Sequence, residues 1–162
     1  MEAACEGAFL VQESAPENLE LKRSLHAQID AASAPETIIA SSSSGLLPSE
    51  IQTATQHPER MLIGHPFNPV YLLPLVELVG GEQTASQTIE TAKAFYANLG
   101  MQPLVVRKEI EGYLSDRLQE ALWREALHLV NDDVATTAEL DAAIIYGCLL
   151  YTSDAADDTP CV

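Results

Sequence analysis

The chain has 162 residues, 47% of them hydrophobic, and its 24 acidic and 8 basic side chains give a formal net charge of −16. That hydrophobic content is typical of a globular protein with a buried core, and the length suits one domain or one domain plus part of another. The acidic excess excludes nucleic acid and anionic membrane surfaces as expected partners, because both are bound through clustered Lys and Arg. A protein that handles a small molecule is the class that remains.

The first predicted elements are a strand and a helix. The apolar run Phe9–Gln12 predicts a short buried strand. Ser14–Glu17 has the S-x-x-E spacing of a capping box, with a proline in the first turn. Leu21, Leu25 and Ile29 then recur every four residues, which predicts an amphipathic helix.

Strands and helices continue to alternate along the next part of the chain. Strands are predicted at Thr37–Ala40, Met61–Gly64, Leu75–Val79 and Leu104–Val106, and helices from Pro48 and over Thr84–Leu99. This alternation indicates a layered α/β sheet.

The pattern becomes purely helical after Lys108. One long helix is predicted from Gly112 to about Val130, and the T-x-x-E spacing of Thr136–Glu139 starts another. We therefore expect an α/β domain over residues 1–108 and a helical domain over residues 109–147.

Residues 148–162 continue no earlier pattern, and we expect them not to be native protein sequence. Cys148–Ser153 can be encoded by TGT CTC TTA TAC ACA TCT, which resembles the transposon mosaic end used in sequencing libraries. The alternative is an ordinary acidic tail. Either way, the tail is expected to carry no function.

No membrane span or secretory signal is predicted. No apolar run reaches the roughly 18 residues that a membrane-spanning helix needs, and the start at Met1–Gly7 is neither basic nor apolar. Cys5, Cys148 and Cys161 are not spaced like metal ligands or a disulfide framework. We expect a cytoplasmic protein without a metal.

The strongest local motif is His65-Pro-Phe-Asn-Pro, with Glu77 twelve residues later. Because the histidine follows one predicted strand and the glutamate lies within the next, adjacent strand ends can bring them together. The unperturbed pKa of histidine, about 6.5, suits proton transfer near neutrality, and a carboxylate on the far ring nitrogen fixes the tautomer. Spacing alone leaves a loop histidine and an unrelated carboxylate as the alternative.

Five blocks together resemble the 3-hydroxyacyl-CoA dehydrogenase superfamily in order and spacing. They are Glu17-Asn-Leu-x-x-Lys22, Ala40–Ser44, His65–Val70, Leu75–Glu77 and Gly112–Arg117. The resemblance covers residues 1–147. It implies the C-terminal half of a Rossmann-like NAD-binding domain, followed by the start of an all-α dimerisation and substrate domain. The glycine-rich phosphate turn of such a domain, G-x-G-x-x-G, is absent from this chain.

Finer features point to one branch of the superfamily. Leu46–Ser49, Tyr71–Val79 and Glu109–Gly112 resemble the hydroxyacid branch, which includes the dehydrogenases of L-gulonate and L-carnitine, and residues 112–126 are most similar to the carnitine-oxidising members. The resemblance thus implies NAD-dependent oxidation of a 3-hydroxyacid, with L-carnitine as the first candidate substrate. It also implies that the full-length enzyme is a homodimer. One alternative is an enzyme that oxidises L-gulonate or a 3-hydroxyacyl-CoA. The other is a non-catalytic protein that keeps the fold, as the crystallin-type relatives in eye lenses do.

The same resemblance implies roles for eight residues. It implies His65 as general base with Glu77 as its partner, substrate contacts from Ser44, Asn68 and Asp116, and cofactor contacts from Glu17, Lys22, Ser42, Ser44 and Asn68. Ser42 stands where many relatives have an asparagine. Structural alternatives stay open: Glu17 can complete the capping box, Lys22 can be a surface charge, the serines can be a turn, and Asn68 can brace its loop.

Asp116 departs from the acyl-CoA-using relatives, which have asparagine at this position. A carboxylate disfavours an anionic substrate and suits a cationic one such as the trimethylammonium group of carnitine. Aromatic side chains also hold such groups, and Tyr71, Tyr113 and Trp123 are candidates, with a core or interface role as the alternative. For Asp116 the alternative is a surface ion pair.

Overall fold

The computed structural model describes residues 1–147, so the tail prediction lies outside the described residues. The chain divides into two compact units, Met1–Asp116 and the residues from Arg117 onward. The predicted boundary near residue 108 stays a prediction. Each unit is described by itself below.

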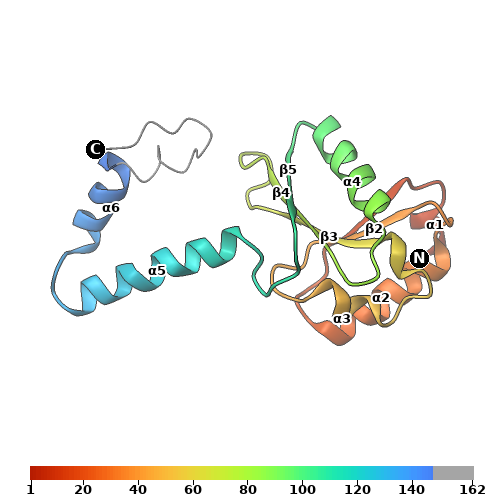
Figure 1. The fold of residues 1–162 in the computed structure, drawn as a ribbon, viewed down its shortest axis with the longest axis horizontal. Coiled ribbons are helices and arrows are strands. Elements are labelled where there is room, and N and C mark those ends of the chain that lie inside the picture. The colour runs from red at the N-terminus through yellow and green to blue at the C-terminus, as the bar shows by residue number, and fades with distance from the viewer. Residues whose placement is uncertain (148–162) are drawn as a thin grey trace. The chain divides into compact units, whose positions relative to one another are not determined.

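The first unit alternates strands with helices (Figure 1). Its elements are α1 (Glu2–Cys5), β1 (Leu10–Glu13), α2 (Leu19–Ala32), β2 (Ile38–Ser41), α3 (Pro48–Gln52), η1 (Pro58–Arg60), β3 (Met61–Pro66), β4 (Leu75–Gly80), α4 (Ser86–Asn98) and β5 (Gln102–Val106). The predicted strands and longer helices are therefore present, while α1 and the single 3₁₀ turn η1 were not predicted.

The five strands form one sheet in the order β1-β2-β3-β4-β5. Neighbouring strands run parallel, except for β3 and β4, which are antiparallel. The layered α/β class is confirmed. The antiparallel pair is joined only by the short loop over residues 67–74, whereas a parallel pair needs a crossover connection.

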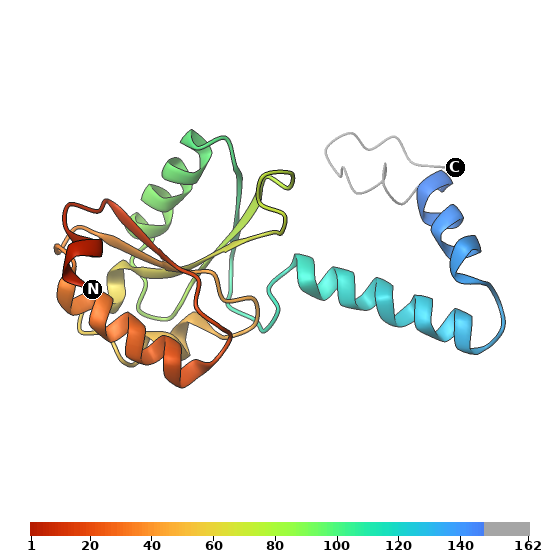
Figure 2. The ribbon, with the colours of Figure 1, turned by 180° about the vertical axis from the view of Figure 1, so that it is seen from behind.

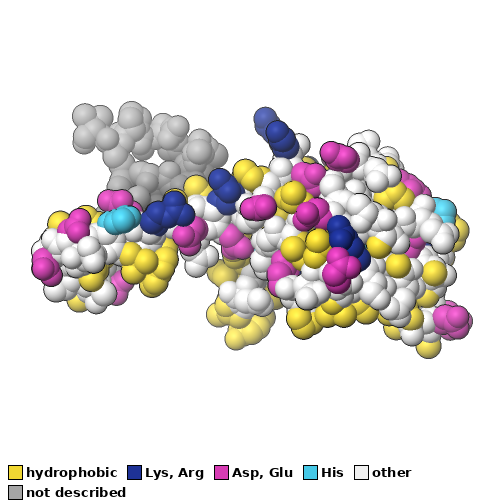
Figure 3. All heavy atoms as spheres, turned by 90° about the horizontal axis from the view of Figure 1, so that it is seen from below, with side chains coloured by type: hydrophobic (Ala, Val, Ile, Leu, Met, Phe, Trp, Pro, Cys, Tyr) yellow, Lys and Arg dark blue, Asp and Glu magenta, His cyan; other side chains and the backbone are white. Residues whose placement is uncertain are grey.

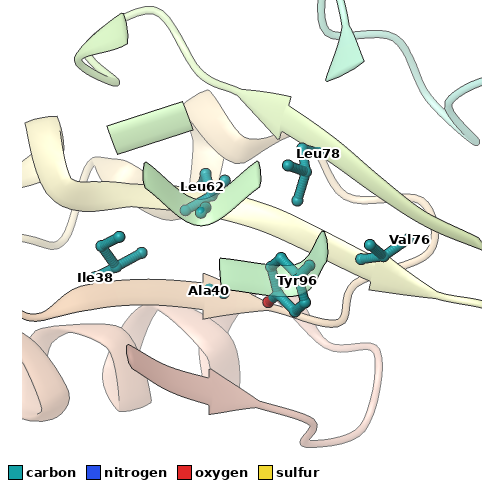
Figure 4. Packing of buried hydrophobic residues seen from close by; sticks show 7 residues of the cluster. Ile38, Ala40, Leu62, Val76, Leu78 and Tyr96 are labelled. Carbon is teal, nitrogen blue, oxygen red and sulfur yellow. The ribbon is translucent and has the colours of Figure 1, made fainter. Parts of the chain in front are cut away.

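Helices cover both faces of the sheet (Figures 1 and 2). On one face, Tyr96 and Ala92 of α4 pack against alternate strand residues, as Figure 4 shows for Tyr96; these are Ile38, Ala40, Leu62, Val76 and Leu78. The other face packs against α2 and α3 through Ile39, Met61, Ile63 and Val79, with Ile29 and Ile51 from the helices. Because strand side chains alternate between faces, this pattern puts His65 and Glu77 on the α2 and α3 face.

Two predicted helix starts are corrected. Helix α2 begins at Leu19 with Asn18 as its N-cap, and the Asn18 side chain accepts a hydrogen bond from the Leu21 backbone. The predicted capping box at Ser14 is therefore wrong, because an asparagine four residues later provides the cap. The next long helix begins at Ser115, not Gly112, because Gly112 and Tyr113 have φ values of 70° and 45°, outside the helical region.

The second unit contains most of α5 (Ser115–Asn131) and all of α6 (Thr137–Tyr146). The predicted capping box of Thr136 and Glu139 at the start of α6 is confirmed. Neither helix buries a residue. Large apolar side chains of α5 stay exposed, namely Leu118, Leu122, Trp123 and Leu127.

The surface reflects the composition. Figure 3 shows Asp and Glu side chains scattered over the face in view. Within residues 1–147, no helix has the length and apolar character needed to cross a membrane.

Candidate active site

His65 and Glu77 lie directly opposite each other in the antiparallel β3–β4 ladder. Opposed residues of such a ladder point to the same face, with their β-carbons about 5 Å apart. The His65 Nδ1 atom is 3.1 Å from Glu77 Oε2. His65 is 5% exposed and Glu77 is fully buried. The strand register thus brings the predicted pair together, and His65 belongs to the strand itself, not to the loop after it.

The second oxygen of Glu77 binds the start of α5. Glu77 Oε1 accepts hydrogen bonds from the backbone N–H groups of Leu114, at 3.1 Å, and Ser115, at 2.9 Å. Burial raises the pKa of Glu77, but the bonds from His65 and from these two N–H groups outweigh it and lower the pKa below its usual value. An ionised Glu77 can only accept, so His65 Nδ1 must donate and Nε2 is left as the basic nitrogen.

The His65 ring contacts two aromatic side chains. The ring centroid of Phe67 is 4.8 Å from that of His65, with an interplanar angle of 62°. Tyr113 makes a similar edge contact, at 5.5 Å and 61°. Tyr113 is fully buried, so it is no exposed wall for a ligand. Tyr71, by contrast, is 86% exposed.

The segment over residues 41–46, called the serine loop here, is held by Glu17. Glu17 Oε1 accepts from the Ser43 hydroxyl at 2.5 Å and from the backbone N–H groups of Ser44, Gly45 and Leu46 at 3.1, 3.0 and 3.3 Å. These bonds lower the pKa of Glu17, although its partial burial raises it. Glu17 and Ser44, both predicted site residues, therefore meet at the end of β2, with Ser44 exposed.

Lys22 lies in a buried cluster that the sequence did not predict. Its Nζ is 2.9 Å from Glu13 Oε1 and 3.9 Å from Glu17 Oε2. Glu13 Oε2 also accepts from Ser41 at 2.7 Å and lies 3.1 Å from His26 Nε2. Lys22 is 1% exposed, so the surface-charge alternative is wrong. Its cofactor contact stays a prediction.

Burial raises the pKa of Glu13, but hydrogen bonds from His26, Ser41 and Lys22 outweigh it and lower the pKa to about 2. Periodicity gave no signal for His26, because the predicted apolar stripe of α2 was Leu21, Leu25 and Ile29, whereas the helix buries Lys22, His26, Ile29 and Asp30 and leaves Leu21 exposed. Glu13, at the end of an apolar strand, gave no signal either.

The remaining predicted residues are Ser42 after β2, Asn68 after β3 and Asp116 in α5. The Ser42 hydroxyl accepts from Gln12 at 2.7 Å and is 2.8 Å from the Ser14 hydroxyl. Asn68 is exposed in the loop after β3. Asp116 is partly exposed in the first turn of α5.

Comparison with known proteins identifies a family and a set of similar dehydrogenases. Residues 1–110 match the family described as "3-hydroxyacyl-CoA dehydrogenase, NAD binding domain". The chain is 63% identical over 153 residues to an L-carnitine dehydrogenase of a Pseudomonas species. The aligned stretch covers 94% of this chain and 48% of that relative. The chain spans about half the length of the curated relatives it matches.

Two solved structures are similar to the chain over most of its length. One is 3-hydroxybutyryl-CoA dehydrogenase from Escherichia coli K12, with a TM-score of 0.83 and 30% identity over 89% of this chain and 30% of that one. The other is 5-formyl-3-hydroxy-2-methylpyridine 4-carboxylic acid 5-dehydrogenase, an NAD⁺-dependent dismutase, with a TM-score of 0.84 and 36% identity over 90% of this chain and 47% of that one.

Proposed function

This chain belongs to the 3-hydroxyacyl-CoA dehydrogenase family, whose NAD-binding domain matches residues 1–110, and we propose that it forms part of an enzyme that oxidises a 3-hydroxyacid. The observation that carries the proposal is the buried pair of His65 and Glu77, held at 3.1 Å by the strand register. The pair leaves one imidazole nitrogen, Nε2, to take a proton.

His65 acts as the general base in this proposal. Its Nε2 removes the proton of the substrate hydroxyl as the hydrogen on the same carbon leaves as hydride. NAD, when bound, supplies the hydride acceptor, and the protein supplies the base and the alignment. Glu77 holds the ring by Nδ1 and stabilises the imidazolium that forms.

The described residues fit one end of NAD. Dinucleotides bind outside the carboxyl ends of the strands in such sheets, and there the chain places Ser42, Ser44 and Glu17, whose hydroxyl and carboxylate groups suit ribose hydroxyls and the carboxamide. Glu17 keeps 43% of its side chain exposed. No glycine-rich turn for the pyrophosphate occurs in the sequence, so the groups that this chain contributes are those for the nicotinamide end. Lys22 would act there through Glu17.

L-carnitine is the substrate that we propose. The support is the 63% identity to an L-carnitine dehydrogenase and the carboxylate of Asp116, which suits a cationic substrate. Ser44 and Asn68, both exposed, are the proposed contacts of the substrate hydroxyl and reacting carbon. The exposed apolar side chains of α5 support the further proposal of a homodimer.

A chimaera tests the function. Residues 1–147 would replace the matching stretch of the Pseudomonas L-carnitine dehydrogenase, and NAD reduction would be followed with L-carnitine, L-gulonate and 3-hydroxybutyryl-CoA. We expect oxidation of L-carnitine above that of both other substrates, and its loss in the same chimaera with His65→Ala. Faster oxidation of either other substrate would reject carnitine. No activity above that of the His65→Ala chimaera with any substrate would reject the enzymatic role.

A further inference from the structure

Tyr113 occupies a backbone conformation that side chains disfavour. Its φ of 45° follows a φ of 70° at Gly112, so two consecutive residues are left-handed before α5 begins. Glycine adopts this region without a penalty, whereas a bulky residue does so only when its surroundings hold it there. Tyr113 is also fully buried. The structure around it therefore fixes both its backbone and its ring.

This turn contacts three parts of the candidate active site. The Tyr113 ring makes an edge contact with the ring of His65. The Tyr113 hydroxyl donates to the backbone carbonyl of Leu46 in the serine loop, at 2.8 Å. The next two N–H groups along the chain bind Glu77. A single left-handed turn thus links the base, its carboxylate partner and the serine loop.

We propose that Tyr113 is a positioning residue for the dehydrogenase reaction, with separate tasks for its ring and its hydroxyl. The ring holds the His65 imidazole in the plane in which Nδ1 meets Glu77. The hydroxyl holds the serine loop, and with it Ser44, at a fixed distance from His65. The inference rests on the proposed function, because only a proton transfer requires this alignment.

A core role alone would not use the hydroxyl. Phenylalanine fills the same volume, and a buried phenolic hydroxyl is costly unless it finds a partner. Here the partner is the carbonyl of Leu46, two residues from Ser44. The other buried tyrosine, Tyr96, serves as the comparison. Its hydroxyl donates to Gln12, and its ring contacts Phe95, not His65.

The ring's task is tested first without any enzymatic assay. Histidine ¹H–¹⁵N spectra of the 162-residue chain, assigned with His65→Ala, report the tautomer of His65. We expect one tautomer, protonated at Nδ1, in the unchanged chain and in Tyr113→Phe and Tyr96→Phe. Tyr113→Leu should give an averaged signal, because the imidazole can then rotate away from Glu77, whose carboxylate otherwise fixes the tautomer. Tyr113→Met, which fills the space with a flexible side chain, replaces it if the leucine variant does not fold.

Kinetics in the chimaera separate the two tasks. Tyr113→Leu should lower kcat about tenfold and change the acidic limb of the pH profile of kcat/KM, since small displacements of a catalytic group are costly. Tyr113→Phe should restore kcat and the profile but raise the KM for the hydroxyacid about threefold, because only the serine loop is released. Tyr96→Phe should leave the pH profile unchanged, because the Tyr96 ring does not contact His65.

Two results would overturn the inference. One is a single Nδ1-protonated tautomer in a folded Tyr113→Leu or Tyr113→Met chain, which would make the ring a core residue only. The other is a Tyr113→Phe chimaera with the KM and kcat of the unchanged chimaera, which would remove the hydroxyl's task. The spectra do not depend on the substrate, so an averaged tautomer in an inactive chimaera rejects the proposed function and leaves the ring's restraint of His65 standing.

Discussion

The first unit contains two buried pairs of glutamate and histidine with the same nitrogen–oxygen distance. His26 Nε2 lies 3.1 Å from Glu13 Oε2, and His65 Nδ1 lies 3.1 Å from Glu77 Oε2. Hydrogen bonds lower the pKa of both carboxyl groups although burial raises it. Residue types, distance and charge therefore do not distinguish a structural pair from a candidate catalytic one.

The surroundings of the two pairs differ. Glu13 also binds the ammonium group of Lys22, and His26 is fully buried with its Nδ1 lacking any hydrogen-bond partner. His65 keeps 7% of its side chain exposed and lies near the carboxyl end of β3, next to the loop that holds the exposed Asn68. The comparison teaches that a histidine–glutamate pair can transfer a proton to or from a ligand only if the ring nitrogen that does not bind the carboxylate is accessible. In the proposed function, Nε2 of His65 meets the substrate, whereas Nδ1 of His26 is buried.

The largest expected effect separates the two histidines. In the chimaera, His65→Ala should lower kcat by about 10²- to 10⁴-fold, the usual contribution of a placed proton acceptor, with little change in the affinity for NAD. The matched change His26→Ala should lower the melting temperature, because it leaves a cavity beside Glu13, but keep kcat per folded enzyme within about threefold. An equal loss of kcat in both variants would contradict the assignment of His65 as the base.

The two carboxylates should separate in the same way. Glu77→Gln should lower kcat by about 10- to 100-fold, less than His65→Ala, because the base remains while its orientation and counter-charge are lost. Glu13→Gln should instead destabilise the chain by about 3 kcal/mol, because the ammonium group of Lys22 stays buried without its partner. Steady-state kinetics of the chimaera and urea unfolding of the 162-residue chain measure the two effects. A Glu13→Gln chain with unchanged stability would contradict the structural role.

The sequence predicted the sheet class, because apolar runs identify strands. The His65–Glu77 pair was predicted through the family resemblance, since the spacing of the motif alone left an unrelated carboxylate as the alternative. The sequence did not predict the antiparallel direction of β4, because direction depends on how the chain returns and not on apolar periodicity. Nor did it predict the Glu13 cluster, because one carboxylate after an apolar strand shows no period. The start of α5 was misplaced because contacts far along the chain hold Tyr113 in a conformation that its own propensity disfavours.

The pH dependence of stability tests the Glu13 pair. The folded-state pKa of Glu13, about 2, lies below the unfolded value, so its contribution is complete above about pH 4.5 and is lost as the pH falls toward 2. The unchanged chain should lose on the order of 2 kcal/mol of unfolding free energy from this group between about pH 6 and pH 3. Glu13→Gln should lose less over the same interval in urea unfolding. Parallel losses in the two chains would show that other carboxylates dominate.

The smallest expected effect concerns selectivity around the His65 pair. Asp116→Asn in the chimaera should raise the KM for L-carnitine about tenfold, since a partly desolvated charge pair exceeds the roughly 1 kcal/mol of an exposed one. The matched measurement uses an uncharged 3-hydroxyacid ester, whose KM should stay nearly constant. If both KM values rise alike, Asp116 supports the structure near Tyr113 and does not select a cation.

The opposed positions of His65 and Glu77 in the β3–β4 ladder have an evolutionary consequence. The ladder sets the spacing of the two backbones, and from the loop over residues 67–74 the first residue, Phe67, adds an edge contact with the His65 ring. Insertions and deletions beyond Phe67 are therefore expected to be tolerated by the pair. A shift of the strand register by one residue, however, would turn one of the two side chains to the opposite face of the sheet. In the β3–β4 hairpin, changes in the loop can therefore alter substrate preference while the proposed proton-transfer pair keeps its position in the ladder.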